Sequence, residues 1–199
     1  MKRVFHATSR ANADKILTEG LKPLVSNRPK ELAVVDFAFD KIAERLGINY
    51  RRSGIFAWPD KKLNVFGDTV ILELIVDPEL SVVMHQAWVD LAWGIVGTVF
   101  SRIGETKRGF VETATPEELF GMFRNVLVYE GRVGHVLFEL AQRYWSSGVS
   151  LADYGDSTRG MLNQKVIEAL PRFQGLLPHL DHEVCLGVGT IESDKISRG

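Results

Sequence analysis

Apolar residues recur at every second position, or form short runs, in four stretches of the chain. The clearest stretch is 69–76, in which every second residue is apolar and an Asp-Pro pair follows at 77–78. Stretches 3–8, 54–58 and 183–188 are shorter and fit the same pattern. A two-residue period puts alternate side chains on opposite faces of a strand. We therefore predict four strands, two of them from opposite ends of the chain.

Between these strands the apolar residues recur at spacings of three and four, which is typical of amphipathic helices. The helix expected after the first strand has Ser9 as its N-cap and stops at Gly20. A second pattern ends at Gly47 and contains Leu32, Val35, Phe39, Ile42 and Leu46. Thr115-Pro116-Glu117-Glu118 combines a threonine cap, a proline at the first helical position and a glutamate at the third, which predicts a capping box. Further helices are expected at 88–99, 133–145 and 162–170, with a closing turn or helix at 192–196.

Strands at both ends and helices between them predict a mixed α+β fold. The length of 199 residues favours one domain, and no segment rich in Pro, Gly or Ser divides the chain. We expect a single domain over 1–199 with a mostly helical insertion at about 78–178.

Composition narrows the class of protein. Hydrophobic residues make up 45%, which excludes a disordered chain, and a net charge of −1 excludes a generically polybasic nucleic-acid binder. The single cysteine, Cys185, excludes an internal disulfide. The most apolar stretch, 88–100, is too short to span a membrane and contains Asp90. Without an apolar leader at the N-terminus, we expect a soluble, cytoplasmic protein or a leaderless exported effector, with no membrane partner.

Polar residues on the first and last strands are candidates for chemistry. Glu183 shares its strand face with Cys185, Gly187 and Gly189, and such small neighbours suggest the floor of a groove. The alternative is an exposed carboxylate at a strand end. His6 and Thr8 lie at the corner between the first strand and the next helix, where they could hold a polar ligand. The alternative is a histidine bonded to backbone.

The first of three short segments is Phe5-His6-Ala7-Thr8-Ser9, followed by a helix with Ala-x-x-Ile-Leu-x-x-Gly-Leu at 13–21. It resembles the opening of many members of the ADP-ribosyltransferase superfamily, in the branch that includes diphtheria-like toxins, poly(ADP-ribose) polymerases and RNA 2′-phosphotransferase-like proteins. Gly54-Ile55-Phe56-Ala57 resembles their second motif, and His182-Glu183-Val184 their third. The resemblance covers about 50 residues and implies a split, antiparallel-rich β-sheet core.

The resemblance implies a role for each matching residue. His6 and Thr8 would hold the sugar of NAD, and Ala7, which stands where the family usually has Gly, would offer backbone groups to the nicotinamide amide. Phe56 replaces the usual Tyr and would stack on the nicotinamide ring. Phe66 is the candidate for a second stacking aromatic, and Glu183 is the catalytic carboxylate.

The chemistry implied is cleavage of the nicotinamide–ribose bond. Cleavage builds positive charge on the ribose, and a nearby carboxylate stabilises that charge. The expected activity is mono-ADP-ribosyl transfer from NAD to a protein or nucleic-acid acceptor, as in a toxin or effector, with transfer to water as an NAD glycohydrolase also open. NAD is the only co-substrate expected, without a metal.

Other functions remain open at this level. One is a catalytically inactive module of the same fold that binds ADP-ribose, NAD or RNA. Another is a metal-dependent hydrolase using His179, His182 and Glu183, although their spacing matches no common zinc motif. Arg51 and Arg52, and Arg28 with Lys30, could hold phosphates or be solvated loop charges. Tyr144, Trp145 and Tyr154 could line an acceptor groove.

Overall fold

We describe a computed structural model of the chain, covering residues 1–23, 29–49, 52–61, 67–102, 108–128, 131–173, 176, 178–179, 181–187 and 189–199. The helices are α1 (Arg10–Glu19), α2 (Lys30–Arg45), α3 (Ala87–Ser101), α4 (Arg108–Thr113), α5 (Pro116–Phe123), α6 (Val133–Ser147) and α7 (Asp156–Ala169). The strands are β1 (Lys2–Ser9), β2 (Ile55–Ala57), β3 (Thr69–Val76), β4 (Ser81–His85), β5 (Leu127–Val128), β6 (Gly131–Arg132), β7 (Val149–Ser150), β8 (His182–Leu186) and β9 (Ile196–Arg198). Short 3₁₀ turns occur at Pro78–Leu80, Leu170–Arg172 and Ser193–Lys195.

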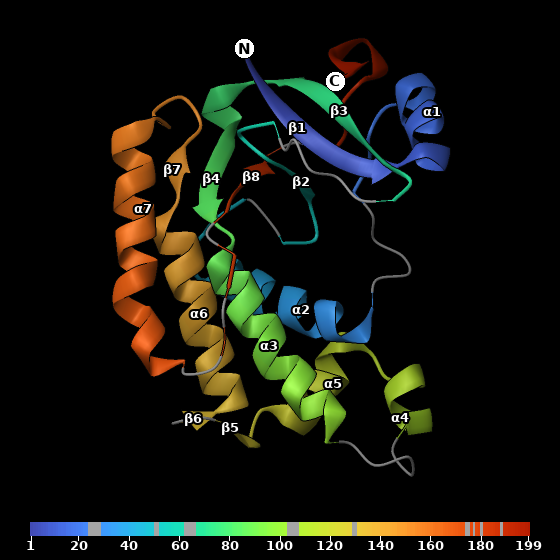
Figure 1. Ribbon diagram of the computed structural model, residues 1–199. Helices are drawn as coiled ribbons and strands as arrows, with labels where there is room; N and C mark the ends of the chain where they lie inside the picture. Colours follow the sequence, from blue (N-terminus) through green and yellow to red (C-terminus); the bar gives the residue numbers. More distant parts are fainter. Residues whose placement is uncertain are drawn as a thin grey trace.

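Two sheets occupy one half of the molecule. One has the strand order β1-β3-β9 and the other β2-β8-β4-β7, and neighbouring strands in both sheets run antiparallel. The sheets meet where Phe5 of β1 and Trp58, just after β2, exchange two backbone hydrogen bonds of 2.8 and 2.7 Å. Both chain ends lie in this half (Figure 1). The predicted α+β class, with strands from both ends meeting, is confirmed.

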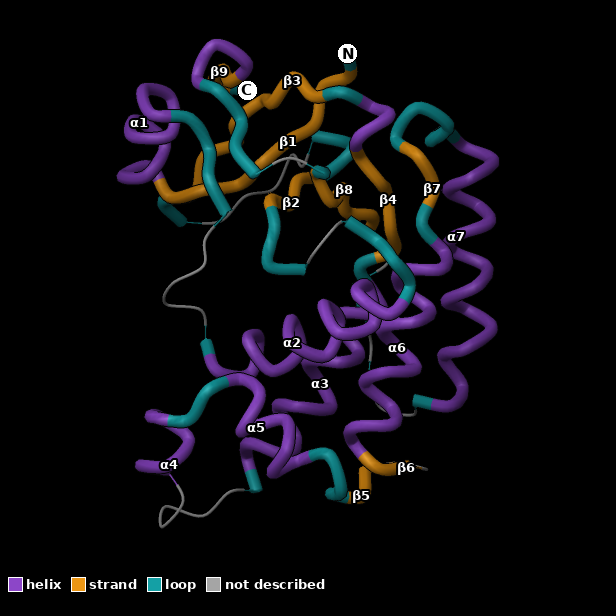
Figure 2. The backbone as a smooth tube through the Cα atoms, turned by 180° about the vertical axis from the view of Figure 1, so that it is seen from behind, coloured by secondary structure: helices purple, strands orange, loops and turns teal. Residues whose placement is uncertain are grey.

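Helices form the other half. α2, α3, α5 and α6 pack together on one side of the β2-β8-β4 strands, while α1 lies beside β1 and β3 (Figure 2). Within this half, the helical core consists mainly of buried apolar residues of α2, α3, α5 and α6, together with Met84 and Cys185. Among the described residues, no helix is long and apolar enough to cross a membrane.

The other face of the same strands lines a second hydrophobic cluster, which we call the strand core. Its main members are Val4, Ile55, Ala57, Leu72, Leu74, Val184 and Leu186. Strand β8 therefore lies between the two cores, because its alternate side chains enter opposite ones. Val184 and Leu186 are buried, at 0% and 3% exposed, and share one face of β8, as the two-residue period of 183–188 indicates. Val188 lies outside the described residues.

Local sequence signals place several helix ends. The Ser9 side chain accepts a hydrogen bond from the backbone N–H of Asn12, as an N-cap does. The capping box of Thr115 and Glu118 is present at the start of α5. In the predicted insertion the sequence analysis missed β4, which pairs with β8 along its whole length. The closing segment also contains β9, which pairs with β3.

Candidate functional site

The three strands that carry the candidate residues are neighbours. β1 holds His6, β2 holds Phe56 and β8 holds Glu183. β2 contacts β1 through the Phe5–Trp58 bridge and pairs with β8 so that Phe56 lies opposite Cys185. Segments from the start, the first third and the end of the chain are thereby assembled side by side.

His6 is joined directly to the second strand. Its Nδ1 lies 2.8 Å from the carbonyl oxygen of Phe56. A carbonyl only accepts, so Nδ1 carries the proton and Nε2 keeps a free lone pair. Burial lowers the pKa of His6, and the hydrogen bond to Phe56 opposes this only in part. The imidazole is therefore neutral at pH 7 and offers Nε2 as an acceptor.

Glu183 lies in a buried polar cluster. Its carboxylate accepts a hydrogen bond of 2.8 Å from Arg52 Nη1 and one of 3.1 Å from the Tyr144 hydroxyl. Arg52 also forms an ion pair with Asp36, with 3.5 Å between Nε and Oδ1. Both Arg52 and Glu183 are only 5% exposed. The expectation of an open groove floor around Glu183 is wrong, because Cys185 on the same face is fully buried in the helical core.

The ring of Phe56 is part of the same cluster. The guanidinium carbon of Arg52 lies 4.0 Å from the centroid of the Phe56 ring, a cation–π contact. One face of the predicted nicotinamide wall is therefore already covered by a guanidinium. The backbone N–H of Arg52 is held by the Asp40 side chain, which fixes the start of this segment.

The electrostatics of the cluster favour a charged arginine and a protonated tyrosine. Burial by itself lowers the pKa of Arg52, but Glu183, Tyr144 and Asp36 raise it above its ordinary value. Burial and then the Glu183 charge raise the pKa of Tyr144 well above its usual range. The tyrosine thus remains a hydrogen-bond donor to the carboxylate.

His6 and Glu183 start from opposite faces of the strand layer. Phe5 lies opposite Trp58, which shares the face of Phe56 and Glu183, so His6 shares the other face with Val4. No contact between described residues joins His6 to Glu183. The structure brings His6 to the backbone of Phe56, and Arg52 links the Phe56 ring to Glu183.

The remaining candidates are distributed as follows. Ala7 and Thr8 follow His6 on β1, where they lie opposite Ile71 and Val70 and are partly exposed. Phe66, Arg28 and Arg51 lie outside the described residues. Lys30 donates to the backbone carbonyl of Ala114, at 2.8 Å, and so is engaged within the protein.

The residues of the metal hypothesis do not converge. His182 and Glu183 are consecutive in β8, so their side chains leave opposite faces of the strand. The His182 ring packs against His85, with 4.7 Å between centroids. Within the described part of the chain, no group of three or more His, Cys, Asp or Glu residues could hold a metal ion.

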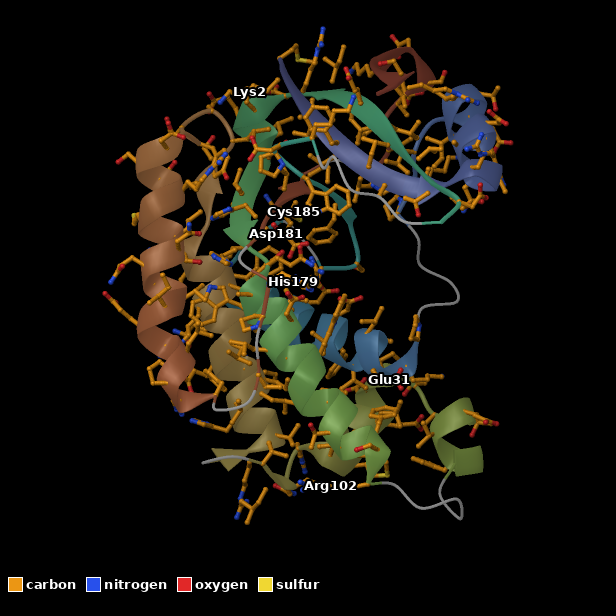
Figure 3. The ribbon with its side chains drawn as sticks, in the orientation of Figure 1. Lys2, Glu31, Arg102, His179, Asp181 and Cys185 are labelled. Atoms are coloured by element: carbon orange, nitrogen blue, oxygen red, sulfur yellow. The ribbon has the colours of Figure 1, made fainter. Side chains whose placement is uncertain are left out.

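Sequence analysis did not foresee the cluster around Glu183. Arg52 was interpreted as a phosphate ligand or a solvated loop charge, yet it is buried and paired with carboxylates. A usable signal was Asp36, which interrupts the apolar face of α2 between Val35 and Phe39. A carboxylate at a buried helix position predicts a buried cation nearby. Figure 3 shows Cys185 of β8 in the middle of the molecule, between the strands and the helices.

No family model, curated protein or solved structure matches this chain.

Proposed function

We propose that this protein transfers ADP-ribose from NAD to a macromolecular acceptor, with release of nicotinamide. The proposal rests on one observation above all: the strands of His6, Phe56 and Glu183 are neighbours, and His6 bonds to the Phe56 backbone. His6 and Glu183 leave opposite faces of the strand layer, so the proposal requires NAD to contact both faces. This arrangement fits the order of the three motifs that resemble ADP-ribosyltransferases. In this proposal the β-sheet core is of the ADP-ribosyltransferase type.

The chemistry assigned to each residue follows from its surroundings. His6 Nε2 would accept a hydrogen bond from a sugar hydroxyl of NAD, with Ala7 and Thr8 beside it. The Glu183 carboxylate, oriented by Arg52 and Tyr144, would stabilise the cationic ribose as nicotinamide leaves. Arg52 covers one face of the Phe56 ring at 4.0 Å, so in this proposal nicotinamide stacks on the other face and Arg52 stays on Glu183.

The test is nicotinamide release from NAD, with and without cell extract, for the unmodified chain and four variants. Glu183→Gln keeps the size of the side chain and removes its charge, so release falls by about 10²–10³-fold while NAD binding is largely kept. His6→Ala weakens NAD binding, Phe56→Ala weakens both binding and turnover, and Phe56→Tyr is tolerated. Glu79→Gln, which changes an exposed carboxylate, is the matched control.

Near-normal release by Glu183→Gln would refute the role of this carboxylate. Thermal unfolding of each variant separates loss of activity from loss of folding. Locating the ADP-ribose label on protein, nucleic acid or neither identifies the acceptor and distinguishes a transferase from a glycohydrolase.

A second candidate is a catalytically inactive module of the same fold that binds ADP-ribose, NAD or RNA. The observation that favours it is that Glu183 is 5% exposed and already engaged by Arg52 and Tyr144, as in a structural ion pair. Saturable binding of NAD or ADP-ribose without nicotinamide release in any extract would support this alternative against the enzyme.

A further inference from the structure

A small polar cavity lies at the beginning of β8, between the segment after β2 and helix α7. Its volume is about 190 Å³, and its lining includes Trp58, Asp60, Arg159, Asn163, Asp181 and His182. An apolar cavity of about 150 Å³ accommodates a benzene molecule. The space beside Trp58 is therefore that of one planar ring and is smaller than a whole nucleotide requires. Asp181 at this end of β8 is labelled in Figure 3.

A chain of hydrogen bonds fixes the orientation of Asn163. The backbone N–H of Ala87 donates to His85 Nδ1 at 3.2 Å, so the proton of the neutral ring is on Nε2. Nε2 in turn donates to Asn163 Oδ1 at 3.1 Å. Burial and then the neighbouring His182 lower the pKa of His85 to about 4, which keeps this arrangement at neutral pH.

Because Asn163 is held by His85, the two N–H donors of its side-chain amide have a fixed direction. The Asn163 carbonyl is used by His85, so its NH₂ group is left to face other partners. Among the described residues, none accepts a hydrogen bond from this NH₂ group. His85 is fully buried and acts as the support that holds the asparagine, as outer partners do in preorganised binding sites.

The rest of the cavity lining offers both hydrogen-bond donors and acceptors without excess positive charge. Arg159 Nη2 donates to Asp60 Oδ2 at 2.6 Å, and its guanidinium lies 5.5 Å from the centroid of the Tyr154 ring. Asp181 adds a second carboxylate to the lining. A free anion is disfavoured here, because the one guanidinium is already neutralised by Asp60. A neutral ligand with both acceptor and donor atoms on its edge fits this cavity lining.

We propose that this cavity binds a planar heterocycle with an amide-like edge, such as a nucleobase or a nicotinamide ring. Asn163 recognises the edge of the ring, and Trp58 supplies an aromatic surface for stacking. Two sources present this chemistry: a free base or nucleoside, and an unstacked base in single-stranded nucleic acid. The inference does not rest on the proposed transfer reaction, because the cavity lining contains none of His6, Phe56 or Glu183.

The test uses the full chain titrated with adenine, uracil and nicotinamide, by calorimetry and by NMR of the Trp58 indole N–H, assigned with Trp58→Phe. We expect saturable binding of at least one ring, with a shift of the Trp58 signal. Asn163→Asp still accepts from His85 but loses the two donors, so affinity falls about tenfold or more. Gln164→Glu makes the same chemical change on the exposed side of α7 and leaves affinity unchanged.

Binding of none of the three rings, or equal binding by Asn163→Asp and Gln164→Glu, overturns the proposal. If Asn163→Asp fails to fold, the ring affinities of Trp58→Leu and Trp58→Phe are compared by calorimetry. Only leucine removes the aromatic surface, so we expect Trp58→Leu to bind more weakly than Trp58→Phe, and equal affinities overturn the proposal. The same base placed in a short single-stranded oligonucleotide distinguishes the two sources. Binding that persists in Glu183→Gln, whatever its effect on NAD turnover, separates this cavity from the proposed transfer site.

Discussion

At the scale of single residues, Arg52 explains why charged groups are tolerated in the interior. One guanidinium contacts two carboxylates, those of Glu183 and Asp36, and covers the ring of Phe56. Each buried carboxylate is stabilised by the same cation, so the three charges depend on one another. Removal of the cation takes the guanidinium away from two buried carboxylates, whereas neutralisation of Glu183 leaves Arg52 still paired with Asp36.

This asymmetry gives a prediction for stability. Arg52→Met lowers the free energy of unfolding by about 3–5 kcal/mol, the usual cost of breaking a buried ion pair. Glu183→Gln costs about 1–3 kcal/mol, because a glutamine oxygen can still accept from Tyr144 or Arg52. Urea unfolding measures both. Arg10→Met removes an exposed arginine that pairs with Asp68 and is the control, with a change below about 1 kcal/mol. Equal costs for Arg52→Met and Glu183→Gln would contradict this account.

Individual candidate residues could be predicted from the sequence only as far as local patterns reach. The positions of His6, Phe56 and Glu183 on strands follow from the two-residue period. The partners of Glu183 do not, because Asp36, Arg52 and Tyr144 come from three segments whose approach depends on packing. Arg52 in particular has the local sequence of an exposed loop and is buried only because α2 and α6 cover it.

At the scale of elements, helix ends are the features most directly encoded. Gly20 follows α1 with φ +81°, and Gly47 follows α2 with φ +68°, both in the left-handed region that favours glycine. They differ in their surroundings. A Cβ at Gly20 would lie 2.5 Å from the backbone oxygen of Ile191, whereas one at Gly47 would meet nothing within 4 Å.

Alanine substitution at the two positions therefore separates backbone strain from a steric clash. Gly47→Ala costs about 1–2 kcal/mol, from the left-handed conformation alone. Gly20→Ala costs more, since it also displaces Ile191, which exchanges two backbone hydrogen bonds with Leu21. Urea unfolding of the two variants gives the difference. A cost at Gly20 no larger than that at Gly47 would show that the Ile191 segment moves aside freely.

Strand β4 shows where element prediction stops. The segment Ser81–His85 is a short run without clear alternation, directly before the helical pattern of α3. Its identity as a strand comes from pairing with β8, about a hundred residues later. Pairing between distant segments leaves no local signature, so the sequence pattern predicts the strands at 3–8, 54–58, 69–76 and 183–188 but not β4.

At the scale of the whole molecule, β8 connects the two hydrophobic cores. Cys185 enters the helical core, while Val184 and Leu186 enter the strand core. The sequence pattern predicts a strand at 183–188, but not that helices cover its Glu183 face, since that cover comes from α2, α3 and α6 together. A strand buried on both faces transmits a loss of packing on one side to the other.

We therefore expect the two cores to unfold as one cooperative unit. Leu186→Ala in the strand core and Leu137→Ala in the helical core, both nearly fully buried, each cost about 2–5 kcal/mol. Native-state hydrogen exchange measures which backbone amides lose protection in each variant. Leu186→Ala should lower the protection of α6 amides by the same free energy as that of β3 amides. Leu137→Ala, in the helical core, should likewise lower the protection of β3 amides as much as that of α6 amides. Leu80→Ala, at a side chain 49% exposed, is the control with little effect. Loss of protection confined to β1 and β3 in Leu186→Ala would mean that the strands and helices unfold separately, with β8 following only the strands.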